Sequence, residues 1–315
     1  MLLSIVVPCY NEEAAVPLFY AETARVLEGC AAKDSSFTAE LVFVDDGSAD
    51  SSAAVLKDLA ARDGRVRYII FSRNFGKEAA MLAGLREARG DAVVMLDADL
   101  QHPPSLIPLL LPAVASGEFD CAGTKRTRKG DSPLRTFFSR LFYRLMARIT
   151  DIEMIDGAGD FRLMSRPYVD ALLSLNERSR FSKGFYPWIG FRTIWFEYEN
   201  AERAAGRTKW SFWKLFQYSL DGITAFSTKP LALASILGVL LFFISLIVIL
   251  WIVVYRLITL NTPHPWTPDG WASTACIVLF CGGIQLFTTG ILGQYLAKTY
   301  TEVKQRPHYV IRERS

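Results

Sequence analysis

Two aspartates, Asp97 and Asp99, stand one residue apart directly after the apolar run Val93–Leu96. Such a run predicts a buried strand, and at its end, where the alternation of side chains breaks, both carboxylates can face one crevice. Carboxylate oxygens are ligands for Mg²⁺ or Mn²⁺ when substrate phosphates complete the coordination shell. The pair therefore indicates a divalent-metal site, although aspartates in a solvated turn would have the same spacing. His102 is either a further ligand or part of the turn that follows.

Acidic and turn-forming residues also end two earlier β-type runs. Pro8-Cys9-Tyr10-Asn11-Glu12-Glu13 follows the first run, and Val44-Asp45-Asp46-Gly47-Ser48 closes the second. Carboxylates at a strand end, followed by Gly and Ser that permit a tight turn, can accept hydrogen bonds from a base or a ribose. We therefore expect nucleotide recognition here. Taken alone, Asp46-Gly47-Ser48 favours the N-terminal cap of a helix instead.

Short β-branched runs alternate with longer stretches of helical periodicity before residue 230. This order is typical of an α/β fold with a mostly parallel sheet, in which ligands bind outside the carboxyl ends of the strands. Strands are expected at Ser4–Cys9, Leu41–Asp45, Val66–Phe71, Ala92–Asp97 and Asp120–Gly123, and helices near Glu12–Leu27, Ser51–Ala61, Lys77–Ala88 and Pro104–Ala115. The acidic residues then stand at the strand ends, where a ligand would bind.

Two long uncharged segments, Leu231–Tyr255 and Trp271–Ala297, contain 25 and 27 residues. A helix of roughly 20 apolar residues crosses the hydrocarbon layer, so two transmembrane helices are expected, with a buried hairpin of a soluble protein as the alternative. Lys and Arg flank the pair on the outside, whereas the connecting loop holds only Arg256. By the positive-inside rule, the first domain and both termini are expected to be cytosolic. The expected location is the inner (plasma) membrane, as a multi-pass protein.

Two further segments, Leu134–Ile149 and Lys209–Phe226, interleave aromatic and aliphatic residues with Arg or Lys. Basic amphipathic helices suit an anionic membrane surface, although helices that face a protein core have a similar pattern. The expected domains are 1–207, a cytosolic catalytic domain; 208–229, amphipathic juxtamembrane helices; 230–298, two transmembrane helices with a short extracytoplasmic loop; and 299–315, a cytosolic basic tail.

Composition excludes several classes of protein. The 35 basic and 32 acidic residues give a net charge of +3, without the concentrated basic excess of a nucleic-acid-binding protein. The five cysteines form no CxxC pair and have no histidines at zinc-ligand spacing, so reduced thiols are expected. No GxGxxG follows the first strand, which argues against a nicotinamide dehydrogenase.

Several segments in chain order resemble one known family. They are Val6–Glu13, Val44–Ser48, Ser72–Glu78, Asp97–Gln101, Gly157–Leu163, Glu177–Phe181 and Arg203–Trp210. Together they resemble the family 2 glycosyltransferases of GT-A fold. More narrowly, nearly the whole chain is similar to the polyprenyl-phosphate glycosyltransferases, a group that includes dolichol-phosphate mannose synthases and bactoprenol glucosyltransferases.

The resemblance implies roles for individual residues. Pro8, Tyr10, Glu12, Asp46, Lys77, Asp97 and Asp99 would bind the nucleotide sugar, and Asp97 and Asp99 would also hold Mg²⁺ or Mn²⁺, with Asp99 as the direct ligand. Arg162, Arg203 and Lys209 would contact the donor diphosphate or the lipid phosphate, where positive charge offsets anionic oxygens. Arg203 and Lys209 would equally suit a surface loop with incidental charges.

By the same resemblance, Asp160 would be the catalytic base, and Asp99 would be the other catalytic residue. A phosphate monoester has its second pKa at about 6, so the acceptor oxygen is already largely ionised at neutral pH. Few acceptor molecules therefore carry a proton that a base could remove. Asp160 would then orient Arg162, the acceptor or the metal, or serve as a structural partner of Arg162.

The expected reaction is a single displacement that inverts the anomeric carbon. The lipid phosphate attacks while the metal stabilises the departing nucleoside diphosphate. One hexose would pass to polyprenyl (undecaprenyl) phosphate from UDP-glucose, with GDP-mannose, UDP-galactose and UDP-N-acetylglucosamine as the other donors. Similarity suggests a homotetramer. A processive polysaccharide synthase would need more membrane spans, and a non-catalytic nucleotide-binding scaffold would leave the acidic pairs and Asp160 unexplained.

Overall fold

The computed structural model describes residues 1–126, 144, 148–150, 155–198, 221–258 and 271–315. These residues form two compact units. The first comprises Met1–Gly222 together with Gln305–Ser315, and the second comprises Ile223–Lys304. The two expected amphipathic helices lie largely outside the described residues, so their contact with a membrane stays a prediction.

The first unit is built on an eight-stranded sheet with the order β7-β5-β6-β4-β1-β2-β3-β8. Its centre is parallel: β1 (Leu2–Cys9) pairs with β2 (Thr38–Asp45) and β4 (Ala92–Met95), and β2 pairs with β3 (Val66–Phe71). The chain runs outward from β1 to β3 and then crosses back to place β4 on the other side of β1. Sheets of this kind bind ligands at such a switch point, beyond the carboxyl ends of the strands.

The rest of the sheet is mixed. β6 (Ala158–Ser165) runs antiparallel to both β4 and β5 (Cys121–Arg126), and β7 (Thr193–Tyr198) pairs parallel with β5. At the opposite edge, β8 (Ile311–Arg314) adds antiparallel to β3, so the C-terminal segment returns to the first unit. The five expected strands are present, with the fourth ending at Met95, before the aspartate pair. β6, β7 and β8 were not predicted.

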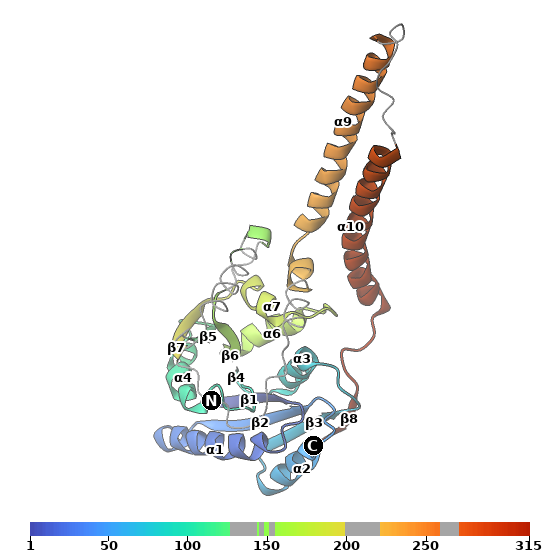
Figure 1. Cartoon of the computed structure of the whole chain (residues 1–315). Coiled ribbons are helices and arrows are strands. Elements are labelled where there is room, and N and C mark those ends of the chain that lie inside the picture. The colour runs from blue at the N-terminus through green and yellow to red at the C-terminus, as the bar shows by residue number, and fades with distance from the viewer. Residues whose placement is uncertain (127–143, 145–147, 151–154, 199–220, 259–270) are drawn as a thin grey trace. The chain divides into compact units, whose positions relative to one another are not determined.

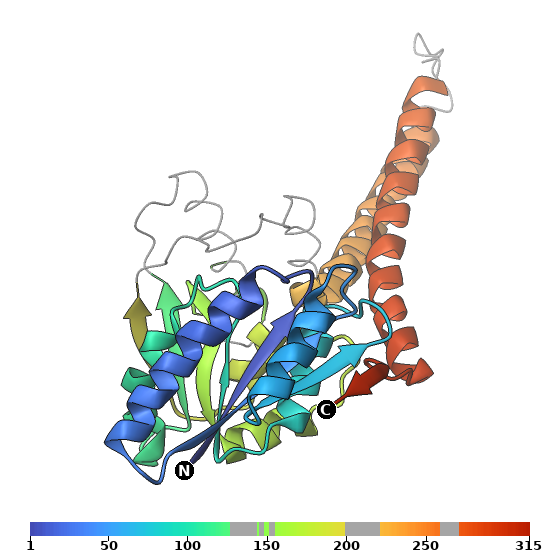
Figure 2. The same ribbon diagram turned by 90° about the horizontal axis from the view of Figure 1, so that it is seen from below.

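Helices cover both faces of the sheet (Figures 1 and 2). One layer contains α1 (Ala15–Lys33), α2 (Ser52–Arg62) and α4 (Ile107–Ala115), which follows the short 3₁₀ turn η1 (Pro104–Leu106). The other contains α3 (Lys77–Glu87), α6 (Arg166–Ser174) and α7 (Ser182–Trp188). The predicted α/β fold with a mostly parallel central sheet is thus confirmed.

The core follows from the alternation of side chains along β1. Leu3, Ile5 and Val7 are fully buried in one cluster with Phe19 of α1, as the two-residue period of a strand requires. On the opposite face, α3 approaches β1 closely at Gly84. A Cβ there would lie 2.2 Å from Cγ1 of Val6. The absence of a side chain at Gly84 therefore lets α3 pack directly on the strands whose ends carry the acidic residues.

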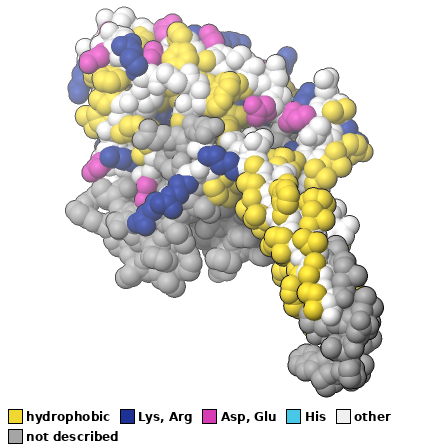
Figure 3. All heavy atoms as spheres, turned by 90° about the horizontal axis from the view of Figure 1, so that it is seen from above, with side chains coloured by type: hydrophobic (Ala, Val, Ile, Leu, Met, Phe, Trp, Pro, Cys, Tyr) yellow, Lys and Arg dark blue, Asp and Glu magenta, His cyan; other side chains and the backbone are white. Residues whose placement is uncertain are grey.

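The second unit consists mainly of two long helices, α9 (Lys229–Ile258) and α10 (Trp271–Lys304), which contact each other. Two segments within them, Lys229–Val248 and Cys276–Lys304, are long and apolar enough to cross a membrane, and none of their most apolar stretch is buried in the protein. The space-filling view shows this apolar surface in yellow (Figure 3). Exposed Leu, Ile, Val and Phe side chains at this density are typical of membrane spans, so both segments are candidate spans.

Candidate active site

The loops that follow β1 and β2 are joined by hydrogen bonds between side chains and backbone. The N–H of Asn11 donates to Oγ of Ser48 at 2.8 Å, and the N–H of Ala49 donates to Oδ1 of Asn11 at 2.8 Å. Asn11 has a φ of 52°, a left-handed conformation that Asn tolerates better than most residues. The two predicted nucleotide-binding segments therefore form one structure at the carboxyl ends of neighbouring strands.

Three predicted donor-binding residues lie along the first of these loops. Pro8 is half-buried near the end of β1, and Tyr10 is 37% exposed. Glu12 is half-buried, and its N–H donates to Oγ of Ser52 at 2.8 Å. An exposed aromatic ring next to ordered backbone is suited to stacking on a planar base.

Asp46 holds the loop that links β3 to α3. Its Oδ1 accepts the N–H of Phe75 at 2.6 Å and its Oδ2 accepts the N–H of Gly76 at 2.9 Å. The adjacent Gly47 has a φ of +67°, and a Cβ there would lie 2.3 Å from the carbonyl carbon of Arg73. Asp46 is only 3% exposed. It thus shapes this loop, and its predicted contact with the donor stays a prediction.

Lys77, the first residue of α3, lies between two carboxylates. Its Nζ is 2.7 Å from Oδ1 of Asp97, which follows β4, and 2.8 Å from Oδ2 of Asp160 on β6. The side chain of Lys77 is 42% exposed, compared with 28% for Asp97 and 17% for Asp160. The antiparallel pairing of β4 and β6 brings together aspartates that are 63 positions apart in the sequence.

Charge in this cluster favours the ionised forms of Lys77 and Asp160. Burial alone would lower the pKa of Lys77, but the carboxylates of Asp160 and Asp97 raise it well above its usual value. Burial would raise the pKa of Asp160, but the cations of Lys77, Lys183 and Arg162 hold it below its usual value. A carboxylate with a lowered pKa accepts a proton poorly. A lowered pKa suits an orienting carboxylate, and the role of Asp160 stays a prediction.

Asp99 and His102 occupy the turn after Asp97. Oδ1 of half-buried Asp99 accepts the N–H of Gln101 at 3.1 Å. Nδ1 of His102 is hydrogen-bonded to the hydroxyl of Tyr198 at 2.6 Å. Burial lowers the pKa of His102, which favours its neutral form. These contacts orient the turn against β7, and His102 lies within the electrostatic reach of Asp97 and Asp160.

Arg162 lies two residues beyond Asp160 on β6 and is only 3% exposed. Its guanidinium lies 3.4 Å from the ring centroid of Tyr186 and donates to the carbonyl oxygen of Gly159 at 2.9 Å. Its Nε has no hydrogen-bond partner among the described residues. Arg162 thus acts on the site through its charge on Asp160, and direct contact with a phosphate stays a prediction.

The residues present fit a hard divalent cation. Among the residues that the structure describes, no group of three or more His, Cys, Asp or Glu side chains could hold a metal ion by itself. Asp97 and Asp160, however, already place carboxylate oxygens around one cation, the ammonium of Lys77. Two carboxylates supplemented by diphosphate oxygens and water are a usual magnesium environment. The sequence predicted Asp97 and Asp99 as the ligands, which stays a prediction, and the fold brings Asp160 to the same ammonium as Asp97.

Two predicted phosphate-binding residues, Arg203 and Lys209, lie outside the described residues. Other residues of the site were not singled out from the sequence. Oε1 and Oε2 of Glu78 accept the N–H of Ser182 at 3.1 and 3.2 Å, and its carboxylate also accepts the Ser182 hydroxyl, which ties the start of α3 to the start of α7. Ser182 and Lys183 have no local signal, because only the packing of α7 brings them to this site.

Comparisons with known proteins identify the family of this chain. Residues 4–173 match the model of "Glycosyl transferase family 2". The "Putative glycosyltransferase CsbB" of Bacillus subtilis is 42% identical over 99% of this chain and 92% of its own length. The "Prophage bactoprenol glucosyl transferase homolog" of Escherichia coli is 39% identical over 99% of each chain, and the "Bactoprenol glucosyl transferase" of Shigella phage SfII is 39% identical over 99% and 98%.

Among solved structures, glucosyl-3-phosphoglycerate synthase from Mycobacterium tuberculosis matches with a TM-score of 0.46 and 19% identity, over 71% of this chain and 77% of that chain. The family match covers more than half of the chain, and the sequence relatives extend over nearly all of it, including the two apolar helices. This chain therefore belongs to glycosyl transferase family 2.

Proposed function

We propose that this chain transfers one glucose residue from UDP-glucose to polyprenyl phosphate, with inversion, at the cytosolic face of the membrane. The observation that carries the proposal is the convergence of Asp97 and Asp160 on one cation at the carboxyl ends of the strands, in a chain with two apolar helices. The names of the bactoprenol glucosyl transferases, similar over their full length, support glucose as the sugar and a polyprenyl phosphate as the acceptor.

The donor would lie along the ends of β1, β2 and β4. Pro8, Tyr10, Glu12 and Asp46 would hold the uridine, and Lys77, Asp97 and Asp99 would lie at the diphosphate. When bound, Mg²⁺ or Mn²⁺ held by Asp97 and Asp99, with Asp160 next to them, would neutralise charge on the leaving diphosphate. A cation held by Asp97 would compete with the Lys77 ammonium, which contacts the same carboxylate, and would displace it. The ammonium would then be free to donate to a diphosphate oxygen.

The acceptor phosphate would approach from the side of β6. Asp160 would orient the acceptor, and Arg162 would keep Asp160 ionised. Arg203 and Lys209 would supply cationic contacts to the lipid phosphate or the donor diphosphate. Because the acceptor oxygen carries its own negative charge, no proton needs to be removed in the displacement.

The two apolar helices would hold the catalytic unit at the bilayer. With both termini cytosolic, the donor is available from the cytosol and the lipid acceptor reaches the site by local encounter at high effective concentration. The protein would reside in the inner (plasma) membrane as a multi-pass protein, and we propose a homotetramer on the basis of similarity.

The test uses the purified full chain in detergent with undecaprenyl phosphate and a panel of radiolabelled UDP-glucose, UDP-galactose, UDP-N-acetylglucosamine and GDP-mannose. We expect label from UDP-glucose in the lipid extract, and loss of transfer in excess EDTA that added Mg²⁺ or Mn²⁺ restores. Asp97→Asn and Asp99→Asn should each lower the rate at least about a hundredfold, the usual cost of removing one group that stabilises transition-state charge.

The matched control is Asp58→Asn, since Asp58 is an exposed aspartate of α2 paired with Arg62 and should leave the rate unchanged. Full turnover in excess EDTA would contradict the metal-dependent mechanism. A product labelled from another donor would replace glucose with that sugar. Nucleotide binding without transfer to any lipid would favour a non-catalytic scaffold. Asp160→Asn should retain measurable transfer, whereas complete loss with intact donor binding would make Asp160 the base.

A further inference from the structure

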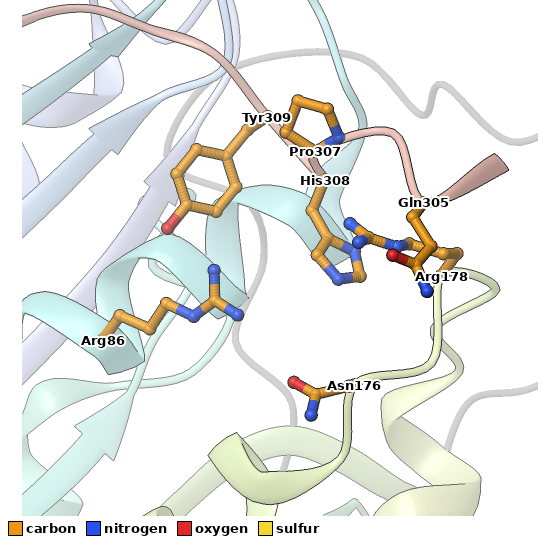
Figure 4. A pocket seen from close by; sticks show the side chains of 7 residues that line it. All are labelled: Arg86, Asn176, Arg178, Gln305, Pro307, His308 and Tyr309. Carbon is orange, nitrogen blue, oxygen red and sulfur yellow. The ribbon is translucent and has the colours of Figure 1, made fainter. Parts of the chain in front are cut away.

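A polar pocket lies in the first unit, away from the aspartate cluster. It has a volume of about 370 Å³ and is lined by side chains that include Arg86, Asn176, Arg178, Gln305, His308 and Tyr309. Figure 4 shows Arg86, Asn176 and His308 extending toward the same space from different parts of the chain. Most of these groups carry N–H donors, and none of the lining residues is acidic.

Three segments that are distant in the sequence converge to form this pocket. Arg86 is in the last turn of α3, Asn176 and Arg178 follow α6, and Gln305 to Tyr309 connect α10 to β8. The ring of Tyr309 stacks on Phe71 with centroids 4.9 Å apart. Pairing of β8 with β3 fixes the connecting segment at its far end. The pocket is therefore held by the sheet and by ring packing.

Two arginines, Arg86 and Arg178, line this pocket, and no Asp or Glu is among its lining residues. Among the described residues, Arg86 forms no ion pair with an acidic group, and its guanidinium lies 6.0 Å from the ring centroid of Tyr309. The neighbouring Glu87 is engaged elsewhere, by Arg67 at 2.9 Å and Arg314 at 3.1 Å. Burial lowers the pKa of Arg180, and Arg86 adds to this lowering, as expected where like charges are crowded.

We propose that this pocket is a binding site for a phosphate group, separate from the catalytic centre. Arginine guanidinium groups present paired N–H donors that match phosphate oxygens, and Arg86, Arg178, Asn176 and His308 surround one space. Arg86 lies nine residues after Lys77 on the same helix, which places the pocket about 13 to 14 Å further along the helix axis than the catalytic lysine. A phosphate bound here is not the one that reacts.

The phosphate could belong to a membrane lipid headgroup or to a soluble anion, because both present the same oxygens. Gln305 follows directly on α10, the second apolar helix, and has a φ of 46°, so the chain turns into the pocket within a few residues of that helix. Anionic lipids are concentrated at the cytosolic surface of a bilayer. The experiment therefore has one arm for each source.

The test uses the full chain and the double variant Arg86→Gln/Arg178→Gln. In the first arm, binding of inorganic phosphate in neutral detergent is measured by calorimetry. In the second arm, retention of phosphatidylglycerol against phosphatidylcholine, from vesicles that contain both, is counted by native mass spectrometry. The control is Arg25→Gln/Arg62→Gln, which removes the same charge from two exposed arginines paired with Glu22 and Asp58.

We expect the pocket variant to weaken binding at least about tenfold in one arm or both, since two charge-assisted contacts are lost. The control should remain close to the wild-type chain. A loss confined to phosphatidylglycerol identifies a lipid headgroup, and a loss confined to inorganic phosphate identifies a soluble anion. Equal binding by the pocket variant and the control in both arms would overturn the proposal.

A second variant guards against a folding defect in the double variant. Asn176→Asp changes an exposed residue of the pocket by one atom and places a negative charge beside the arginines. It should weaken the same binding while the thermal unfolding midpoint stays at the wild-type value. Unchanged phosphate and phosphatidylglycerol binding by Asn176→Asp would also count against the site.

Discussion

Replacement of Lys77 with Met tests whether the aspartate cluster depends on its internal cation. The ammonium bridges Asp97 at 2.7 Å and Asp160 at 2.8 Å. Without the ammonium, the two carboxylates, which are 28% and 17% exposed, repel each other with less positive charge nearby to offset the repulsion. A buried pair broken on one side costs about 3–5 kcal/mol. Because Lys77 itself is 42% exposed, solvent screens part of its interaction with the carboxylates. We therefore expect a cost of about 2 kcal/mol.

The assay is thermal unfolding of the full chain in detergent, without added divalent ions. A cost of about 2 kcal/mol corresponds to a decrease of roughly 4–8 °C in the midpoint for a unit of this size. Lys57→Met is the matched control, because Lys57 is 45% exposed and pairs with one exposed carboxylate, Glu313, at 2.6 Å. Its loss should cost at most about 1 kcal/mol.

Addition of Mg²⁺ or Mn²⁺ gives the same experiment a second measurement. In the Lys77→Met chain the carboxylates have no ammonium to displace, so the ion should bind more tightly and raise the midpoint more than in the wild-type chain. The reasoning is refuted if Lys77→Met unfolds at the same temperature as Lys57→Met and the metal shifts both midpoints equally.

Two further predictions concern the stability of the first unit. Gly47→Ala should destabilise it by about 2–4 kcal/mol, because the new Cβ would overlap the backbone of Arg73 and the left-handed φ is strained. The control is Gly117→Ala. Gly117 has a similar φ of +74° but open space around it, so this change should cost only about 1 kcal/mol. Arg65 holds the pKa of Asp63 down, at about 2. The folded-state pKa is thus below the unfolded value of about 3.9, so the pair contributes above about pH 4 and is lost as the pH falls toward 2. Asp63→Asn should therefore lower the unfolding midpoint at pH 6 and match the wild-type chain near pH 2; an equal deficit at both pH values would contradict this.

Local sequence pattern predicted the central part of the fold well. β1 to β4 are apolar runs with β-branched residues, and each ends in residues that cannot continue a strand, so their positions follow from burial and turn chemistry alone. The match between Val66–Phe71 as expected and as observed is an example. The long helices α9 and α10 were also predictable from the sequence, because more than twenty consecutive residues without a charge are typical of a membrane-spanning helix.

The strands that were missed share a physical reason. β6 contains Gly159, Asp160 and Arg162 among its apolar residues, and β8 has the charged sequence Ile-Arg-Glu-Arg. Neither has the hydrophobic pattern of a buried strand. β6 is a strand because β4 and β5 provide hydrogen-bonding edges on both sides, and β8 is one because β3 provides an open edge. Pairing partners so distant in the sequence leave no local signal.

The sequence by itself determined which residue types are available for chemistry: the acidic strand ends, the Asp97 and Asp99 pair, Lys77 and Asp160, and two apolar helices. Only the tertiary structure decided which of them meet. The antiparallel pairing of β4 with β6 brings Asp160 to the cation that Asp97 also contacts, and the return of the C-terminal segment builds a basic pocket around Arg86. The physical reason is that spacing along a chain constrains neighbours within a strand or helix, whereas contacts between elements depend on how their apolar faces pack.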